Sequence, residues 1–387
     1  MGDSFLHYHP DGKVFVLLLD SSPKTWPADQ AALGDFTLIH PHDFLPDPKF
    51  SQMFFQYSVV EAATAIKPSF LQHLFTQYQL SSLVYIDPDI EFFSSMQTVW
   101  TALKRNSILL TPHLLEPNLE SNFYRVERDL LLCGIYNLGF LALRNSASTT
   151  RFLTWWKMRL EFHCRNRMEE GLFVDQKWVD FAPGMFGDLG ILRHAGLNAA
   201  HWNSRERPIQ RRRGRFYANN EPLIFYHFSG YHPGVPNALS KDSPRKMAAE
   251  SPDLQSLYAH YRAQLLGADY ERYSRIPYAF NYWKNGIKIP QPARNIFRNQ
   301  RPHGRRNPFV VKEPGGFFSE LLRAEGPHLP PLIQEMWNMR ADVQAAYPDP
   351  VGIHRAQVMN WAVVAGWKEF EMDAKLGKLF ELVGNLR

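Results

Sequence analysis

Cysteine is scarce in this sequence: Cys133 and Cys164 are the only two among its 387 residues. Two cysteines cannot form the network of disulfides that stabilises small secreted domains. We therefore expect a protein of a reducing compartment, the cytoplasm, whose stability comes from a buried core.

Long hydrophobic runs are missing as well. The longest aliphatic run spans Val14 to Leu19, far short of the ~20 residues that a membrane-spanning helix needs. Residues 1–12 are mostly polar, so we expect no signal peptide. Any membrane association would be peripheral, at the inner face. The sequence also contains no internal repeat and no nucleotide-binding loop of the Gly-x-Gly-x-x-Gly or Gly-Lys-Ser/Thr kind.

Aromatic residues, by contrast, are many: 28 Phe, 16 Tyr and 10 Trp. They suit pockets that stack against flat ligands. Hydrophobic residues make up 45% of the chain and charged residues 21%, which is typical of a folded globular protein. The length suggests two or three domains.

The net charge of +5 is unevenly distributed. Arginines gather in two clusters: Arg205, Arg207, Arg211, Arg212, Arg213 and Arg215 in the first, and Arg301, Arg305 and Arg306 in the second. Either cluster could meet phosphate groups on a lipid-linked or polyanionic acceptor, although a solvated loop is the simpler interpretation. We expect no nucleic-acid partner, because the aromatic residues are not interleaved with the basic ones as a stacking platform requires.

Short apolar runs alternate with helical patterns up to about residue 230. We expect strands at 14–19, 34–39, 83–86 and 134–143, a helix at 97–103, and a helix that opens at Pro68. This alternation predicts an α/β domain with a mostly parallel sheet. Beyond residue 240 the periodicity is helical, in the stretches 254–266, 317–323, 331–345 and 354–369. We therefore divide the chain into an α/β domain, residues 1–240, and an α-helical C-terminal region, residues 241–387.

One acidic stretch stands out within the α/β region. Leu83 to Ile86 form an apolar run suited to a buried strand, and Asp87-Pro88-Asp89 follows directly. The proline cannot continue the strand's hydrogen-bond ladder, so both carboxylates fall at its carboxyl end, where ligands of open α/β sheets bind. Two carboxylates this close repel unless a cation or proton lies between them, and their oxygens suit Mg²⁺ or Mn²⁺. The alternative is a turn with two solvated acids.

Five segments in order carry a resemblance to a known family. They are Glu61 to Pro68 with the following Asp87-Pro88-Asp89, Tyr136 to Gly139, Phe173 to Trp178, Asn198 to Asn203, and Tyr226 to Gly230. Over roughly residues 4–245 the chain resembles GT-A fold glycosyltransferases with an Asp-x-Asp motif, and among them the glycogenin-like and bacterial lipopolysaccharide hexosyltransferase branch.

The resemblance implies a metal-dependent hexosyltransferase that uses a nucleotide-diphosphate sugar, UDP-linked in our expectation. Its acceptor would be a hydroxyl group of a glycan or a lipid-linked molecule in polysaccharide or lipopolysaccharide biosynthesis. The branch retains the configuration of the anomeric carbon. The implied Mn²⁺ or Mg²⁺ ligands are Asp87, Asp89 and His227, the catalytic residues are Asn137, Asp175 and Gln176, and the donor-binding residues are Lys67, Tyr136, Gly139, Asn203, Gly230, Lys241 and Arg245.

Some of these residues have ordinary alternatives. His227 could be a satisfied core or loop histidine. Lys67 could be a solvated lysine at a helix start, while Asn137 and Asp175 could serve as turn or cap residues.

Two departures from the family pattern matter. After the His-x-x-Gly segment the glycogenin branch has Lys-Pro-Trp, whereas this chain has Tyr231-His232-Pro233-Gly234, so Lys241 or Arg245 would have to contact the diphosphate. GT-A domains also begin with a strand ahead of the helix that we expect at residues 4–9, so the N-terminal strand is missing here. We expect either a natural start upstream or an incomplete nucleotide pocket. The second case leaves the alternative of an inactive GT-A-like binding or scaffold protein.

Overall fold

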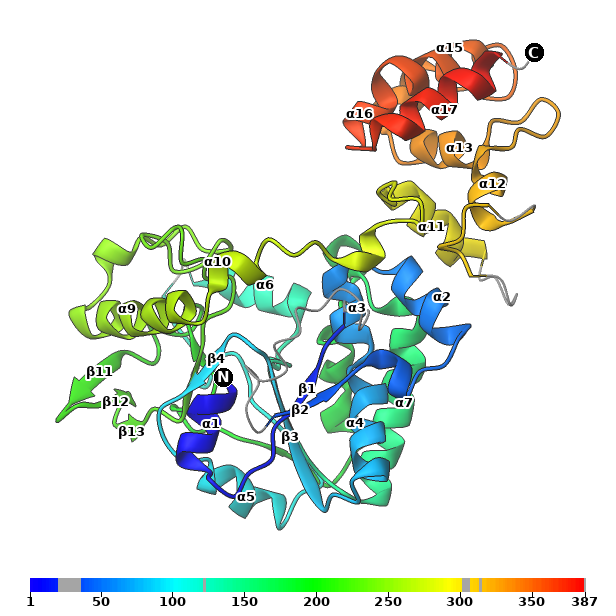
Figure 1. Cartoon of the computed structure of the whole chain (residues 1–387). Coiled ribbons are helices and arrows are strands. Elements are labelled where there is room, and N and C mark those ends of the chain that lie inside the picture. The colour runs from blue at the N-terminus through cyan, green and yellow to red at the C-terminus, as the bar shows by residue number, and fades with distance from the viewer. Residues whose placement is uncertain (20–35, 121–122, 301–306, 313–314, 386–387) are drawn as a thin grey trace. The chain divides into compact units, whose positions relative to one another are not determined.

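The computed structural model of the chain describes residues 1–19, 36–120, 123–300, 307–312 and 315–385 (Figure 1). These residues form two compact units. Unit 1 holds residues 1–18, 36–40 and 63–276, and unit 2 holds residue 19, residues 41–62 and residues 277–385. The domain division between residues 240 and 241 stays a prediction.

Unit 1 mixes helices and strands, as predicted. Its main helices are α1 (Gly2–Tyr8), α4 (Lys67–Gln77), α5 (Gln97–Leu103), α6 (Tyr124–Cys133), α7 (Ala147–His163), α8 (Ala182–Met185), α9 (Pro252–Gly267) and α10 (Tyr270–Tyr273). Helix α3 (Val59–Ala65) precedes α4, and Pro68 lies in the first turn of α4, as expected for a proline that opens a helix.

The central sheet has the strand order β3-β6-β5-β9, formed by Ser82–Ile86, Phe140–Arg144, Ile108–Leu110 and Leu189–Ile191. Strand β6 runs antiparallel to both β3 and β5, and only β5 and β9 are parallel. The prediction of a mostly parallel sheet was therefore wrong. A strand buried on both faces is apolar throughout whichever way its neighbours run, so the run Phe140 to Leu143 could not reveal its direction.

A second sheet has the order β10-β14-β4, formed by Ala199–Ala200, Phe225–His227 and Ile90–Phe92. Strand β14 is parallel to β10 and antiparallel to β4. Three further sheets occur in the described part of the unit: β1-β2 (Phe15–Leu17, Thr37–Ile39), β7-β8 (Asn166–Arg167, Leu172–Phe173) and β11-β12-β13 (Ile209–Arg212, Arg215–Ala218, Glu221–Pro222).

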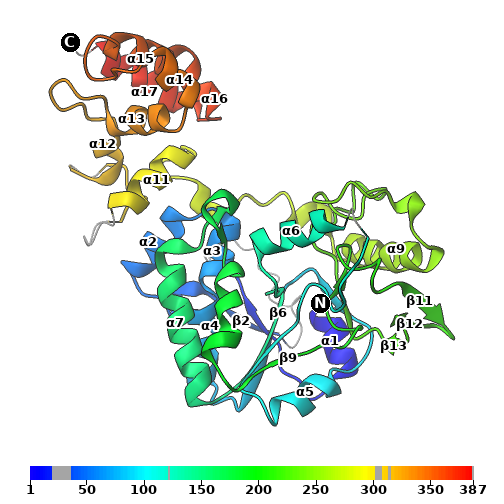
Figure 2. The same ribbon diagram turned by 180° about the vertical axis from the view of Figure 1, so that it is seen from behind.

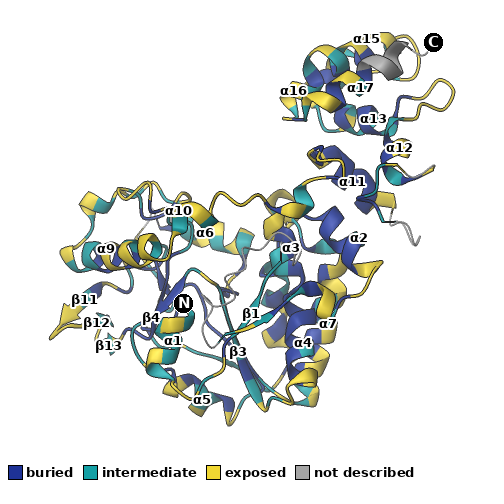
Figure 3. Cartoon of the chain, viewed as in Figure 1, coloured by how far each residue is buried: buried dark blue, intermediate teal, exposed yellow. Residues whose placement is uncertain are grey.

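Helices cover the central sheet. Figure 2 shows α4 and α7 side by side, and α5 packs against β5 and β6. Phe140 and Ala142 lie on one face of β6 and join Val99 and Leu103 of α5 in a buried cluster. The buried colour is almost continuous along the core side of α4 (Figure 3).

Several predicted elements are shorter than the sequence suggested. Val14 to Leu19 contributes only the three-residue strand β1, and of these residues only Val14 is buried. The predicted strand 134–143 begins at Phe140. Residues 34 and 35 of the strand predicted at 34–39, and all three arginines of the second cluster, lie outside the described residues.

Unit 2 is helical in its C-terminal part, which confirms the helical C-terminal region. Its helices include α2 (Lys49–Gln56), α11 (Gln291–Gln300), α12 (Phe317–Leu322), α13 (Pro331–Asn338), α14 (Ala341–Ala346), α15 (Arg355–Trp361), the π-helix η7 (Ala362–Gly366), α16 (Trp367–Glu369) and α17 (Ala374–Asn385). The helix predicted at 331–345 is in fact two helices, α13 and α14, and α11 and α17 were not foreseen.

Candidate functional site

The acidic stretch lies where the central sheet meets the sheet β10-β14-β4. The backbone N–H of Asp87 donates to the carbonyl of Gly139 (2.8 Å), directly beyond the pairing of β3 with β6. On the other side, the N–H of Phe228 donates to the carbonyl of Asp89 (2.8 Å), beyond the pairing of β14 with β4. The antiparallel pairing of β3 with β6 and that of β14 with β4 thus bring the segment before β6 and His227 to the acidic stretch.

Asp87, Asp89 and His227 form a cluster suited to a metal ion. One ligand atom from each lies within 4.8 Å of the others. His227 Nε2 is 3.0 Å from Asp89 Oδ1 and 4.0 Å from Asp87 Oδ2. The aspartate side chains are 27% and 38% exposed while that of His227 is 4% exposed, so the carboxylates form the open side. Two carboxylate oxygens and one imidazole nitrogen fit Mn²⁺ or Mg²⁺ with further oxygens from a ligand.

Both ring nitrogens of His227 face oxygens. Nδ1 is 3.3 Å from Oδ1 of Asn198, and Nε2 faces Asp89. Burial lowers the pKa of His227, but the charges of Asp89 and Asp87 outweigh it and raise the pKa above its ordinary value. The pKa of Asp89 is lowered because the contact with His227 outweighs its desolvation. A cation at this cluster would take the place of the proton on Nε2.

Lys67 is buried beside the acidic stretch. Its Nζ lies 3.0 Å from Asp175 Oδ2 and 3.6 Å from Asp87 Oδ1, and it donates to the carbonyl of Leu138 (3.1 Å). Burial favours the neutral amine, yet these two carboxylates raise the pKa of Lys67 well above its usual value. With its side chain 4% exposed, Lys67 is not the solvated lysine of the alternative interpretation.

The Asp175-Gln176 pair faces the same segment. Asp175 is 2% exposed, and its desolvation raises its pKa despite the ion pair with Lys67. Gln176 accepts from the N–H of Leu138 (3.1 Å) and donates to the carbonyl of Cys133 (2.9 Å). Both amide atoms of Gln176 therefore hold the backbone that leads into β6.

Asn137 connects the site to a buried polar network. Its Oδ1 accepts from the N–H of Gly139 and from Nδ2 of Asn198, each at 3.0 Å. Its Nδ2 lies 3.2 Å from Nε2 of His113. Burial lowers the pKa of His113 to about 4, so His113 is neutral near pH 7. Because its Nδ1 lies against the carbonyl of Ile135 (3.0 Å), Nε2 is left to accept from Asn137.

The other predicted donor-binding residues are more dispersed. Tyr136 is buried, and its backbone forms an isolated antiparallel β-bridge with Pro112. The Nδ2 atom of Asn203 donates to the carbonyls of His113 and Asn198. The carbonyl of Gly230 accepts from the N–H of Lys241 (2.9 Å), and the Lys241 side chain is exposed.

Arg245 is already engaged. It pairs with Glu250 and donates to the carbonyl of His201 and to Ser204. Its guanidinium therefore supports the loop at residues 201–204.

The sequence did not single out three residues of this site. The hydroxyl of Tyr85 donates to Asp87 Oδ1 (2.6 Å), and the Tyr85 ring lies under Lys67. His113 supports Asn137, and Trp202 packs edge-on against His227, with ring centroids 5.3 Å apart. Tyr85 lies two residues before Asp87 and Trp202 lies within the segment 198–203, so both are near residues that the sequence did indicate, whereas His113 has no such neighbour.

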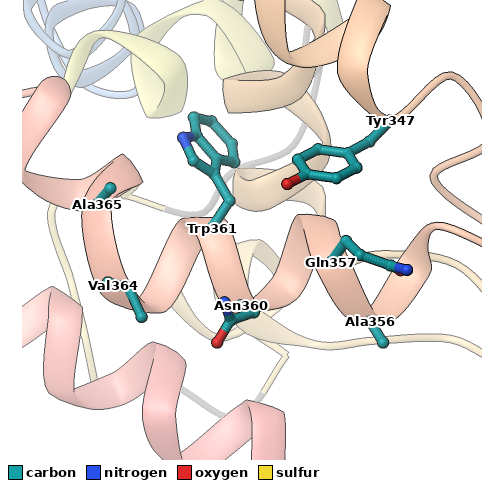
Figure 4. A pocket seen from close by; sticks show the side chains of 7 residues that line it. All are labelled: Tyr347, Ala356, Gln357, Asn360, Trp361, Val364 and Ala365. Carbon is teal, nitrogen blue, oxygen red and sulfur yellow. The ribbon is translucent and has the colours of Figure 1, made fainter.

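A hollow of about 470 Å³ occurs in unit 2 (Figure 4). Its wall is formed by Tyr347, Ala356, Gln357, Asn360, Trp361, Val364 and Ala365. Its polar side chains are one phenol, one indole and two amides, and no carboxylate, histidine or lysine is among the residues of the wall. No helix within the described ranges is long and apolar enough to cross a bilayer.

Comparisons with known proteins give relatives without an assigned function and solved glycosyltransferases. No family model matches the chain. It is 32% identical over 174 residues to the uncharacterized protein YfnF of Bacillus subtilis (strain 168), a match that covers 44% of this chain and 57% of YfnF. It is 27% identical over 231 residues to the uncharacterized protein YfnD of the same organism, covering 58% of this chain and 71% of YfnD. The chain thus spans less than two thirds of YfnF.

Among solved structures, the chain is similar to the galactosyltransferase LgtC in complex with donor and acceptor sugar analogues, with 16% identity and a TM-score of 0.36. That match covers 68% of this chain and 89% of LgtC. It is also similar to mouse xyloside xylosyltransferase 1 in its apo form, with 11% identity, a TM-score of 0.35, and coverage of 58% and 88%.

Proposed function

We propose that this chain is a glycosyltransferase of the GT-A type that moves a hexose from a nucleotide-diphosphate sugar to a hydroxyl group of a glycan or lipid-linked acceptor. One observation carries the proposal: Asp87, Asp89 and His227 converge at an open edge, with a buried Lys67–Asp175 ion pair directly behind them. The five ordered sequence segments that resemble this family support it.

Asp87, Asp89 and His227 would hold a divalent cation, Mn²⁺ or Mg²⁺. Such a cation supplies Lewis-acid stabilisation of the negative charge that develops on a leaving diphosphate. The carboxylates are the exposed members of the cluster, so a diphosphate would approach from their side.

The surrounding residues would orient the donor. Lys67 keeps its positive charge between Asp87 and Asp175, which balances the acidic cluster and fixes Asp87. Asn137 and Gln176 carry donors and acceptors that could select a hexose by its hydroxyl pattern. Both amides bind protein atoms here, so contact with a sugar would require them to exchange partners. Transfer with retention and a UDP-sugar donor follow from the resemblance.

Calorimetric titration with UDP in the presence and absence of Mn²⁺ tests the proposal. We expect UDP binding that depends on Mn²⁺, and Asp89→Asn should abolish both this binding and donor turnover. The matched control Asp129→Asn removes a carboxylate that is 63% exposed, and it should leave both unchanged. Turnover that survives in Asp89→Asn would contradict the assignment, and no UDP binding at all would favour the scaffold alternative.

The donor can be identified by thermal unfolding. A ligand that binds only the folded state raises the melting temperature. Among a panel of nucleotide sugars with Mn²⁺, the true donor should give the largest increase, and Asp89→Asn should remove it.

A further inference from the structure

The first arginine cluster forms a defined structure. Strand β11 (Ile209–Arg212) and strand β12 (Arg215–Ala218) pair as an antiparallel hairpin, with Arg212 opposite Arg215 and the turn at Arg213-Gly214. Both turn residues have positive φ, 50° and 81°, as in the type I′ turn that suits tight hairpins. We call the exposed Arg211, Arg212, Arg213 and Arg215 with these strands the arginine hairpin. These four arginines are exposed to solvent, as in the simpler interpretation, but they lie on a paired hairpin and not on a loop, because a glycine at the second turn position allows the strands to pair.

The base of the arginine hairpin is fixed to unit 1. Ile209 and Ala218 are buried, and Phe216 packs against the same buried cluster. The N–H of Arg211 donates to Asp253 Oδ2 of α9 (2.9 Å). The strand ends nearest the core are held in this way, while residues 211–215 at the turn are exposed to solvent. Figure 3 shows the tip of this hairpin in the exposed colour.

No carboxylate within the described ranges forms an ion pair with any of the four guanidinium groups of the arginine hairpin. The side-chain hydrogen bonds of Arg212 go to the neutral Gln210 and Asn220. Arg212 and Arg215 are directly cross-strand, and like charges in that position destabilise a hairpin. An external anion would relieve this repulsion.

The shape of the arginine hairpin favours a flat anionic surface. Its exposed arginines lie on both strands and on the turn that joins them, so several guanidinium groups can meet neighbouring phosphates of one surface at the same time. The two aromatic rings of the hairpin are already covered: Arg211 lies over Phe216 and Arg212 over Tyr217, both at 5.6 Å. Neither ring is a free platform for base stacking. Guanidinium groups bind phosphate oxygens in a bidentate manner.

We propose that the arginine hairpin docks the protein on a bilayer surface rich in anionic phospholipids. The phosphates of neighbouring headgroups would contact Arg212, Arg213 and Arg215 together. This proposal does not depend on glycosyl transfer, because it rests on the charge and geometry of β11 and β12 alone.

Vesicle co-sedimentation of the full chain tests it. We expect binding to vesicles of phosphatidylcholine mixed with phosphatidylglycerol, little binding to phosphatidylcholine alone, and release as the salt concentration rises. The variant Arg212→Ser/Arg213→Ser/Arg215→Ser should bind anionic vesicles on the order of 100-fold more weakly, since each basic residue near such a surface contributes about fivefold.

A matched control separates the hairpin from net charge. Arg105→Ser/Arg125→Ser/Arg275→Ser removes three exposed arginines from other elements and should bind nearly as tightly as the wild type. Equal melting temperatures would show that both variants fold. The proposal is overturned if the wild type does not bind anionic vesicles, or if both variants lose binding equally. It is also overturned if single-stranded RNA binds the hairpin and displaces the vesicles, which would make nucleic acid the partner.

Discussion

At the scale of single residues, the side-chain amide of Asn198 determines which ring nitrogen of His227 carries the proton. Its Nδ2 donates to Thr111 Oγ1 (2.9 Å) and to Asn137 Oδ1 (3.0 Å), which leaves Oδ1 facing Nδ1 of His227. The Oδ1 atom of Asn198 accepts a hydrogen bond from the N–H at Nδ1 of His227. In the neutral ring the other nitrogen, Nε2, is then unprotonated and can bind a cation. Partners of this kind orient metal-binding histidines in many proteins.

The variant Asn198→Gly tests this role. Asn198 has φ of 55°, and glycine adopts that conformation without strain. We expect the affinity for Mn²⁺, measured by calorimetry, to fall about 10- to 100-fold. The control Asn219→Gly has the same φ of 55° but no contact with His227, and it should keep wild-type affinity. Equal affinities in the two variants would refute the role of Asn198.

Gly139 is required for a close approach. A Cβ atom at this position would lie 2.4 Å from Cε1 of His227 and 2.8 Å from Oδ1 of Asn137. Gly139→Ala should displace the imidazole, weaken Mn²⁺ binding, and lower the free energy of unfolding by about 1–3 kcal/mol. Calorimetry and denaturant unfolding measure the two effects.

Gly184→Ala is the matched control for Gly139→Ala. Nothing lies within 4 Å of a Cβ atom at Gly184, which lies in helix α8, so this variant should be at least as stable as the wild type, with a gain of up to about 1 kcal/mol. Unchanged Mn²⁺ affinity in Gly139→Ala would contradict the packing of His227 against this glycine.

At the scale of elements, helix α11 stabilises the end of helix α2. Arg294 is buried and donates to the carbonyls of Phe54, Phe55 and Tyr57, where α2 ends. The last carbonyls of a helix have no partner within it, so a guanidinium from another helix satisfies them. Burial lowers the pKa of Arg294 to about 10, and the side chain remains charged near pH 7.

We expect Arg294→Met to destabilise unit 2 by roughly 3 kcal/mol, because several buried carbonyls lose their donor at once. Denaturant unfolding measures the loss. The control Arg340→Met removes a partly exposed arginine that pairs with Asp342 and Glu369, and it should cost less than about 1 kcal/mol. A loss in Arg294→Met no larger than in the control would show that other groups satisfy the end of α2.

At the scale of the whole molecule, buried histidines make stability depend on pH. Burial lowers the pKa of His113 and of His201 from 6.5 to about 4. Between these values the unfolded chain binds protons that the folded chain does not, so stability falls as the pH is lowered from about 6.5 towards 4. Each histidine would contribute roughly 3 kcal/mol over this range.

Unfolding free energies measured across this pH range test the linkage. His113→Gln replaces the imidazole by an amide that can still form hydrogen bonds but cannot take up the proton, so its stability should fall less steeply than that of the wild type. Carboxylates titrate in both proteins, and the difference between the two slopes therefore belongs to His113. Parallel slopes would contradict the lowered pKa.

The sequence by itself determined the features that depend on neighbouring residues. An apolar run followed by Asp87-Pro88-Asp89 placed two carboxylates at the end of β3, and the helix predicted at 97–103 matches α5. Local propensity, periodicity and proline geometry act over a few residues, which is why these predictions held. The convergence of Asp87, Asp89 and His227 was anticipated only through the family resemblance.

The tertiary structure alone decided which distant residues meet. The antiparallel direction of β6 sets Gly139 against Asp87, the pairing of β14 with β4 sets His227 beside Asp89, and the fold buries Lys67 between two carboxylates. These contacts join residues 20 to about 140 positions apart in the chain. No local pattern encodes them, because strand direction and the burial of a charge depend on the whole set of packed neighbours.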